Sequence, residues 1–279
     1  TVGNEIKKAY GSGIYIKEDE KLTLQDLLYG LMLRSGNDAA LAIANNVSKN
    51  TESFVKKMNE KAQELDMKNS LFRNPHGLDQ EDGGNISTAY DMAKLTSYAM
   101  KNKNFKKIVA TEKYTLKTNK NTYVWHNKNK LLYRYKYTTG GKTGFTKIAR
   151  RTLVTTASKN NLNLVVVTLN DGNDFTDHEN LFEYAFNNYT NYKILSKGFI
   201  KIKKENYYKK HKLYIKNDYS YPLSIDEKDS IRIKYQLKKI RKLKNNSKVG
   251  TAKIYFGDKL VHEENIYLKY SSKKSKGWF

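Results

Sequence analysis

Two short motifs in the sequence hold side chains that could do chemistry. Ser35-Gly36-Asn37 separates two apolar segments, and Lys142-Thr143-Gly144 follows two glycines and precedes a strand-forming stretch. A serine hydroxyl can both accept and donate a hydrogen bond, and a lysine supplies a positive charge. Taken alone, the first motif is more simply a turn between two helices. The second is more simply a basic edge strand whose glycine permits close approach of a backbone.

Other catalytic signatures are absent from the sequence. It contains no G-x-S-x-G, H-E-x-x-H or Walker motif. The five histidines do not fall at the spacing of metal ligands, and no cysteine is present to complete a metal site, form a disulfide or act as a nucleophile. We therefore expect no metal and no cofactor.

The elements that must position the two motifs change type along the chain. Thr23 and Asp26 have the spacing of a capping box, and apolar residues then recur at helical spacing over residues 24–32, 39–47 and 54–62. We expect a turn at residues 74–77 and, after it, a helix whose N-cap is Ser87.

From about residue 111 the apolar pattern has the period of strands. Short strands are predicted at 114–116, 122–125, 151–157 and 162–169, and a last helix at 177–189. Helices followed by an antiparallel sheet and a terminal helix predict an α+β domain, which we place at residues 1–194.

The composition shifts after about residue 195. Apolar residues alternate with Lys or Tyr, which predicts a small β-rich domain at 195–270 with a hairpin turn at Gly257-Asp258, and a basic then aromatic tail at 271–279. No run approaches the roughly 18–20 apolar residues of a membrane span, so no transmembrane helix is expected within the chain.

The charge of the chain is strongly positive. There are 52 Lys and Arg against 28 Asp and Glu, a net charge of +24, and residues 196–279 hold 23 basic and 8 acidic residues. Such an excess suggests a polyanion, either nucleic acid, an anionic membrane surface or a wall polymer, but it also fits a solvated lysine-rich surface. Charge alone does not name the partner.

The two motifs together, in this order, are the pair carried by serine acyltransferases of the penicillin-binding type. Residues 28–40, 74–79, 87–93 and 141–146 resemble the D-alanyl-D-alanine carboxypeptidases among the low-molecular-mass penicillin-binding proteins. The resemblance is dense over residues 1–190 and rests on domain order alone beyond 195. It implies a β-lactamase/transpeptidase-like α+β domain, with helices on an antiparallel sheet, followed by a small all-β domain.

The resemblance implies a serine peptidase that removes the terminal D-Ala of peptidoglycan stem peptides through an acyl-enzyme. Such an enzyme would also be acylated by β-lactam antibiotics. Ser35 would pass a proton toward the leaving nitrogen, and Asn37 would hold the peptide amide of the substrate. Lys142 would be a fixed positive charge that favours a deprotonated base lysine and attracts the anionic peptide.

The resemblance also implies that the strand after Lys142 binds the substrate. The Thr143 hydroxyl would bind the terminal carboxylate. Gly144, which has no side chain, would let the substrate backbone lie against the strand. The backbone N–H of Phe145 would be one donor of the oxyanion hole.

One part of the family pattern is missing. Relatives carry the nucleophilic serine and the base lysine in a Ser-x-x-Lys some tens of residues before Ser-x-Asn, and this chain begins too late to contain it. The matches at 53–56 and 271–274 lie in a helix after Ser35 and in the tail, and we take both as chance. The 279 residues alone are therefore expected to be inactive.

Smaller departures concern how the substrate is positioned. Ala149-Arg150 stands where the family often has Ala-Gly, and Asn85 stands where it usually has His. Asn173-Asp174-Phe175 lies where relatives often place an arginine. None of these changes alters the reaction class that the resemblance implies.

The resemblance places the protein outside the cytoplasm, in the bacterial cell envelope at the outer face of the cytoplasmic membrane. The tail at 271–279 would begin an amphipathic anchor that contacts the anionic membrane surface, although a solvated tail is the alternative. Another possible function is a non-catalytic peptidoglycan-binding relative of the same fold. A β-lactamase would need a water-activating Glu, for which we see no candidate. No nucleic-acid partner is expected, because only the charge favours one.

Overall fold

Thr23 and Asp26 begin the first α-helix, α1 (Leu24–Arg34), with the capping box that the sequence predicts. Helices α2 (Asn37–Ser48) and α3 (Thr51–Glu64) follow after short turns. Their apolar residues pack into a buried core that also takes in Ile14 and Trp125. Gly30 allows this packing, because a Cβ there would lie 2.5 Å from Ile14 Cδ1.

The computed structural model describes residues 1–81, 83–203, 205–242 and 244–270. The chain divides into two units, Thr1–Ala185 and Phe186–Phe279. The domain limits that we drew at residues 194 and 270 stay predictions, and the predicted tail at 271–279 lies outside the described residues.

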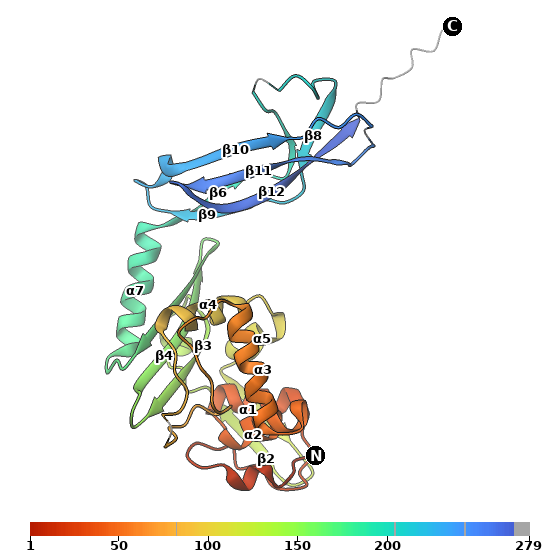
Figure 1. Ribbon diagram of the computed structural model, residues 1–279. Helices are drawn as coiled ribbons and strands as arrows, with labels where there is room; N and C mark the ends of the chain where they lie inside the picture. The colour runs from red at the N-terminus through yellow and green to blue at the C-terminus, as the bar shows by residue number, and fades with distance from the viewer. Residues whose placement is uncertain (82, 204, 243, 271–279) are drawn as a thin grey trace. The chain divides into compact units, whose positions relative to one another are not determined.

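Unit 1 is an α+β arrangement around a three-stranded antiparallel sheet. Strands β3 (Thr138–Thr146), β4 (Arg150–Lys159) and β5 (Leu162–Leu169) pair in that order, which leaves β3 at one edge. Helix α4 (Ala89–Ala99) packs against β5, and α5 (Lys103–Val109) packs against β3. Figure 1 shows α7 (Asp174–Asn188) beside the opposite face of this sheet.

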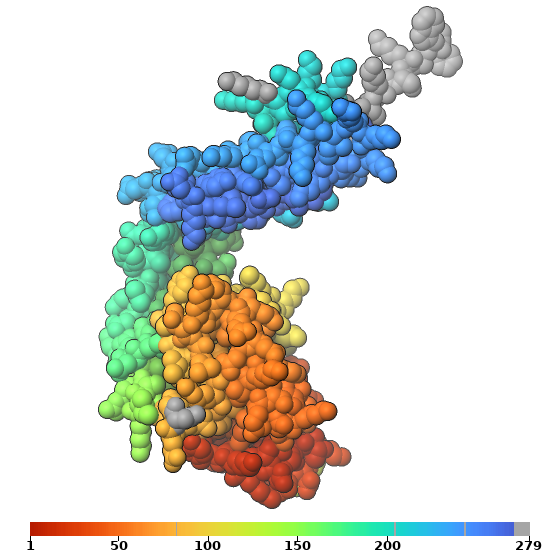
Figure 2. Space-filling view, in the orientation of Figure 1, coloured from red at the N-terminus to blue at the C-terminus, as the bar shows by residue number. Residues whose placement is uncertain are grey.

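Three smaller elements complete unit 1. The predicted strands at 114–116 and 122–125 are β1 (Lys113–Lys117) and β2 (Thr122–His126), which pair as an antiparallel hairpin, and a short helix, α6 (Leu131–Arg134), follows them. A 3-10 helix covers Asn4–Lys8. In the space-filling view, the first half of unit 1, coloured red to orange, forms most of the face of unit 1 that is turned to the reader (Figure 2).

Some details differ from the sequence-based expectations. The N-cap of α4 is Thr88 rather than Ser87, because the Thr88 side chain accepts the backbone N–H of Asp91 while the Ser87 hydroxyl bonds to Ser70. Helix α7 begins three residues earlier than predicted, at Asp174. The short helices α5 and α6 were not predicted at all.

Unit 2 is β-rich, as the alternating pattern predicts. A five-stranded antiparallel sheet has the order β10-β11-β12-β8-β7, and β6 pairs with β9. The strands are β6 (Thr190–Leu195), β7 (Gly198–Ile200), β8 (His211–Ile215), β9 (Tyr219–Leu223), β10 (Ile231–Leu237), β11 (Lys248–Phe256) and β12 (Lys259–Tyr270). A short 3-10 helix covers Lys228–Ser230. Alternate apolar residues fill a core on one face of the sheet.

No helix within residues 1–81, 83–203, 205–242 and 244–270 has both the length and the apolar composition to cross a bilayer.

Candidate active site

Ser35 occupies the corner between α1 and α2. It is the C-cap of α1, and its φ of 60° and ψ of 44° lie in the left-handed region, which non-glycine residues seldom adopt. Its backbone N–H bonds to Leu31 O at 3.0 Å, and α2 begins two residues later. The end of one helix and the start of the next thus fix the place of the hydroxyl.

Lys142 reaches this corner from β3. Its Nζ lies 2.5 Å from Ser35 Oγ and 2.5 Å from the carbonyl oxygen of Thr143. Burial lowers the pKa of Lys142 to about 8, and the nearby charge of Lys128 contributes to this shift. The structure therefore brings together Ser35 and Lys142, to which the resemblance gives roles in one reaction, although they are 107 positions apart.

Asn37 turns its side chain toward the preceding segment of the chain. Its Nδ2 donates to Tyr10 O at 2.6 Å, and its backbone N–H donates to Ser12 O at 2.9 Å. The amide nitrogen is therefore engaged within the protein. The role predicted for Asn37, holding a substrate amide, would fall to its amide oxygen as an acceptor.

Asp38, which the sequence analysis did not single out, anchors that same segment. Its buried carboxylate accepts the backbone N–H groups of Ile14 at 3.0 Å, Tyr15 at 2.7 Å and Ile16 at 3.3 Å. It also accepts Ala39 N at 2.9 Å, at the positive end of the α2 dipole. Asp38 thus fixes an irregular segment against the start of α2.

A second lysine lies near the corner. Lys128 follows β2, its backbone N–H donates to Leu33 O at 3.1 Å, and its Nζ lies 3.4 Å from Ser12 Oγ. Burial lowers the pKa of Lys128, and the charge of Arg34 adds to the effect. No motif in the sequence marks Lys128, because its place depends on β2 ending against the end of α1.

The predicted substrate-binding residues line the outer edge of the sheet. Thr143, Gly144 and Phe145 pair with Leu153, Thr152 and Arg151 of β4, and β3 has no partner strand on its other side among the described residues. The backbone groups on that side are therefore positioned so that an extended peptide could add as a further strand.

The glycines of β3 allow close packing. A Cβ on Gly144 would lie 2.4 Å from Thr152 Oγ1, and a Cβ on Gly141 would lie 2.3 Å from the carbonyl oxygen of Val154. A Cβ on Gly140 would lie 2.4 Å from Val109 Cγ2, at the end of α5. These glycines therefore let α5 and β4 approach the strand that carries Lys142.

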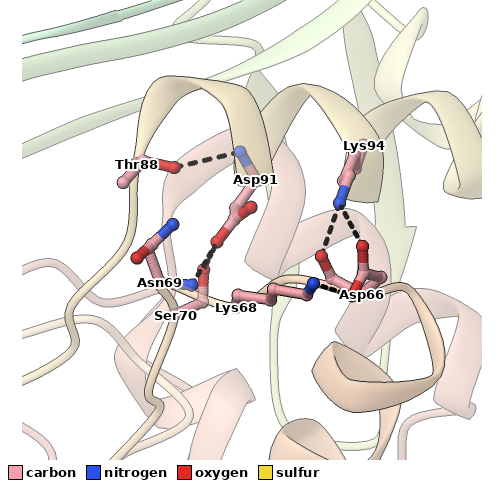
Figure 3. Close-up of polar contacts among 7 residues, drawn as sticks. All are labelled: Asp66, Lys68, Asn69, Ser70, Thr88, Asp91 and Lys94. Carbon is pink, nitrogen blue, oxygen red and sulfur yellow. Dashed lines mark hydrogen bonds and ion pairs between the residues drawn. The ribbon is translucent and has the colours of Figure 1, made fainter.

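A loop over residues 71–86 borders the corner, and its base is tied to α4. Asp91 accepts the backbone N–H of Asn69 and the hydroxyl of Ser70, each at 2.9 Å, and Thr88 caps the helix (Figure 3). Beside them, Lys94 bonds to Asp66, whose carboxylate also pairs with Lys68 at 3.5 Å (Figure 3).

The far end of this loop reaches the candidate site. Asp79 Oδ2 accepts the backbone N–H of Ile148, just after β3, and Asp79 O accepts the hydroxyl of Tyr10, both at 3.2 Å. Within the loop, Asn85 Oδ1 accepts the backbone N–H groups of Arg73 at 2.7 Å and Asn74 at 3.1 Å. Asn85, at the place where the family usually has His, thus holds the two sides of the loop together.

The departure from the family pattern at residues 173–175 also has a local role. Asp174 is buried and pairs with Arg151 of β4 at 2.6 Å. The guanidinium of Arg151 lies 5.5 Å from the ring centroid of Phe175. Residues 174 and 175 therefore hold an arginine that stands opposite Phe145 in the sheet.

Neither Ser-x-x-Lys match inside the chain has a described contact with this corner. Ser53 lies in the first turn of α3, where its backbone N–H donates to Asn50 Oδ1 at 2.8 Å. The match at 271–274 lies outside the described residues. Over the described ranges, no group of three or more His, Asp or Glu side chains could hold a metal ion.

The chain thus has a helical and sheet unit followed by a β-rich unit. Penicillin-binding protein 5 from Haemophilus influenzae has this fold, with a TM-score of 0.75 and 25% identity over 97% of this chain and 81% of that one. Residues 1–173 match the family described as D-alanyl-D-alanine carboxypeptidase, and residues 189–274 match the C-terminal domain of penicillin-binding protein 5. The chain belongs to the D-alanyl-D-alanine carboxypeptidase family.

Curated relatives agree with this assignment over unit 1. The D-alanyl-D-alanine carboxypeptidase DacF of Bacillus subtilis is 39% identical over 158 residues, which is 56% of this chain and 40% of that protein. The D-alanyl-D-alanine carboxypeptidase of Streptomyces sp. strain K15 is 36% identical over 174 residues, 55% of this chain and 59% of that protein. The match thus spans about half the length of these relatives.

Proposed function

We propose that unit 1 supplies the Ser35–Lys142 side of a serine-type D-Ala-D-Ala carboxypeptidase site. The site would remove the terminal D-Ala of peptidoglycan stem peptides and be acylated by β-lactams. The observation that carries the proposal is the 2.5 Å contact between Lys142 Nζ and Ser35 Oγ, beside the edge of β3 that pairs with no other described strand.

The proposed reaction proceeds through an ester. The nucleophilic serine oxygen bonds to the carbonyl carbon of the penultimate D-Ala, the bond to the nitrogen of the terminal D-Ala breaks, and water later hydrolyses the ester. The serine proton passes to the base lysine and then, through the Ser35 hydroxyl, to the leaving nitrogen. Lys142 stabilises this arrangement by its charge, and Asn37 accepts from the substrate amide.

The edge of β3 would hold the substrate beside this relay. The Thr143 hydroxyl binds the terminal carboxylate, and the substrate backbone pairs with the strand at Gly144. The backbone N–H of Phe145 is one donor to the oxyanion that develops on the carbonyl oxygen; loss of one such donor typically costs about 10²–10³ in rate.

The nucleophile and the base are proposed to come from a Ser-x-x-Lys that none of the described residues supplies next to Ser35. We therefore expect no covalent labelling of the 279-residue chain by fluorescent penicillin. A polypeptide that carries the family's Ser-x-x-Lys before residue 1 should be labelled at a single serine. Gel fluorescence and intact-mass spectrometry measure both results.

The matched control is the longer polypeptide with that upstream serine changed to alanine, which should not be labelled. Labelling of the 279-residue chain at Ser53 would contradict the proposed source of the nucleophile. A longer polypeptide that stays unlabelled but binds muropeptides would instead favour the alternative, a non-catalytic peptidoglycan-binding relative.

The pH dependence of acylation tests the role of Lys142. Its pKa is lowered to about 8, so Lys142 loses its charge as the pH rises through that value, and acylation should slow there. Lys128→Gln removes a neighbouring positive charge, so the pKa of Lys142 should rise. The fall in acylation rate at alkaline pH (the alkaline limb of the pH profile) should then move to higher pH. Burial is the larger cause of the lowered pKa of Lys142 and is unchanged in this variant. The pKa of Lys142, and with it the alkaline limb, should therefore stay below the usual range of lysine.

Acylation rate constants of the longer polypeptide, measured across this pH range, check the shift. Lys147→Gln, an exposed lysine after β3, is the control and should leave the limb in place. An unchanged limb in Lys128→Gln would mean that Lys128 does not act through Lys142.

We also propose that the protein works in the cell envelope, at the outer face of the cytoplasmic membrane. The family assignment of both units supports this location. The sequence of the tail, with three lysines followed by Trp278 and Phe279, is consistent with contact to an anionic surface.

A further inference from the structure

Three aromatic side chains form a row on the outer face of the unit 2 sheet. The strand register places Phe199 of β7 opposite Tyr214 of β8, and Tyr214 opposite Tyr267 of β12. Their ring centroids are 6.4 and 5.6 Å apart. Neighbouring residues such as Leu213 and Ile266 point to the buried core, so the row lies on the opposite, solvent-facing side.

Three lysines surround this row on the same face. Lys212 lies opposite Lys269, and Lys216 continues the alternation of β8. Lys216 Nζ is 3.9 Å from the ring centroid of Tyr267, and the Nζ atoms of Lys212 and Lys269 are 5.1 and 6.0 Å from that of Phe199. Within the described residues, none of the three has a carboxylate within 4.0 Å, so their charges are not neutralised by ion pairs. We call these six residues the aromatic–lysine face.

The geometry of the rings limits what this face could bind. The neighbouring rings are inclined by 79° and 31°, so the row does not form one flat platform for a glycan. Ammonium groups also lie over the rings of Phe199 and Tyr267. The charge and these contacts favour an anionic partner over a neutral glycan.

Phe199 distinguishes between two kinds of anionic partner. Its side chain is apolar and 60% exposed between lysines. A hydrated polyanion would leave that ring in water. A lipid surface would place it among the headgroups and upper acyl chains while the lysines meet phosphate groups, the arrangement in which aromatic and basic side chains bind bilayer interfaces.

We propose that the aromatic–lysine face binds the anionic surface of a phospholipid bilayer. This contact involves the folded sheet of unit 2 and is separate from any contact made by the tail at 271–279. The face gives unit 2 a defined side toward the lipid, with the lysines on phosphates and the aromatic row at the interface.

Binding of the full 279-residue chain to vesicles tests the proposal. The probe is a vesicle of phosphatidylglycerol and phosphatidylcholine, with phosphatidylcholine alone as the neutral reference. Each lysine near an anionic surface contributes roughly a factor of five, so Lys212→Gln, Lys216→Gln and Lys269→Gln together should weaken binding about 100-fold. Co-sedimentation measures the partition coefficient.

A matched variant removes the same charge from unit 1. Lys103→Gln, Lys106→Gln and Lys107→Gln change three exposed lysines of α5. This variant should bind the anionic vesicles within about twofold of the unchanged chain, because α5 is not part of the aromatic–lysine face. An equal loss in both variants would mean that net charge, not this face, drives binding.

A substitution in the aromatic row tests the orientation. Phe199→Trp, combined with Trp278→Phe, should show a blue-shifted emission on addition of anionic vesicles and quenching by lipids brominated in their acyl chains. If the vesicles leave the emission of the indole introduced by Phe199→Trp unchanged, the proposal is overturned. The proposal would also be overturned if the Lys212, Lys216 and Lys269 variant bound vesicles fully and lost this binding when 271–279 was deleted. Binding of the chain to soluble polyphosphate, without binding to vesicles, would overturn it as well.

Discussion

Replacing Lys142 by glutamine should slow acylation by penicillin about 10²–10³-fold in a polypeptide that carries the family's Ser-x-x-Lys. The reason is electrostatic. The Lys142 ammonium donates to Ser35 Oγ at 2.5 Å and is partly buried, so glutamine would remove a positive charge from a place where water screens it poorly. Stopped-flow fluorescence with a labelled penicillin measures the second-order rate constant.

Two further variants make this result specific. Lys147→Gln removes an exposed lysine shortly after β3 and should leave the rate constant within about twofold, because an exposed charge is screened. Lys142→Arg keeps the charge but does not titrate in the accessible pH range, so its residual activity should lack the alkaline limb. Full activity of Lys142→Gln would refute the assigned role of Lys142.

Replacing Asp38 by alanine should destabilise unit 1 by about 3–5 kcal/mol. The carboxylate is 6% exposed and accepts four backbone N–H groups, three of them from residues 14–16. Alanine would leave these donors without a charged acceptor and would free the segment that contacts Asn37. Urea unfolding followed by the fluorescence of buried Trp125, in a Trp278→Phe background, measures the change in unit 1 alone.

Asp66→Ala is the matched control for this prediction. Asp66 is an exposed carboxylate that pairs with Lys68 and Lys94, so its removal should leave the urea midpoint close to that of the unchanged chain. An Asp38→Ala variant with the same midpoint would show that water replaces the carboxylate at no cost. Slower acylation in Asp38→Ala, with Asp66→Ala unaffected, would link the anchored segment to the site.

Candidate site residues can be predicted from the sequence when they lie in short motifs. Residues that reach the site only through tertiary contacts cannot be predicted in this way. Ser35 and Lys142 can be found because each lies in a recognisable triplet. Asp38 resembles any first-turn acidic residue of a helix, and its partners are backbone groups of an irregular segment that carries no pattern. Lys128 reaches the corner only because its backbone, just after β2, bonds to Leu33.

The same division holds for the fold. The capping box at Thr23 and the period-two strands are local signals, and both are confirmed. Ser87 and Thr88 are both good N-cap residues, so the sequence alone does not decide between them. In the structure Thr88 is the N-cap of α4, because the Ser87 hydroxyl bonds to the distant Ser70. Helices α5 and α6 are too short to show a periodicity, and packing against β3 determines them.

The edge of β3 that would receive a peptide, which has no partner strand in the described part of the chain, is also exposed to a second copy of the same strand. Phe145 in β3 and Ile148 in the turn after it are 64% and 71% exposed, so two molecules could align edge to edge, exclude peptide from this edge and begin aggregation. Lys147 and Arg150, at the turn between β3 and β4, place like charges where such copies would meet. Electrostatic repulsion at this turn therefore helps keep this edge of β3 free in concentrated solution, and high salt weakens that protection.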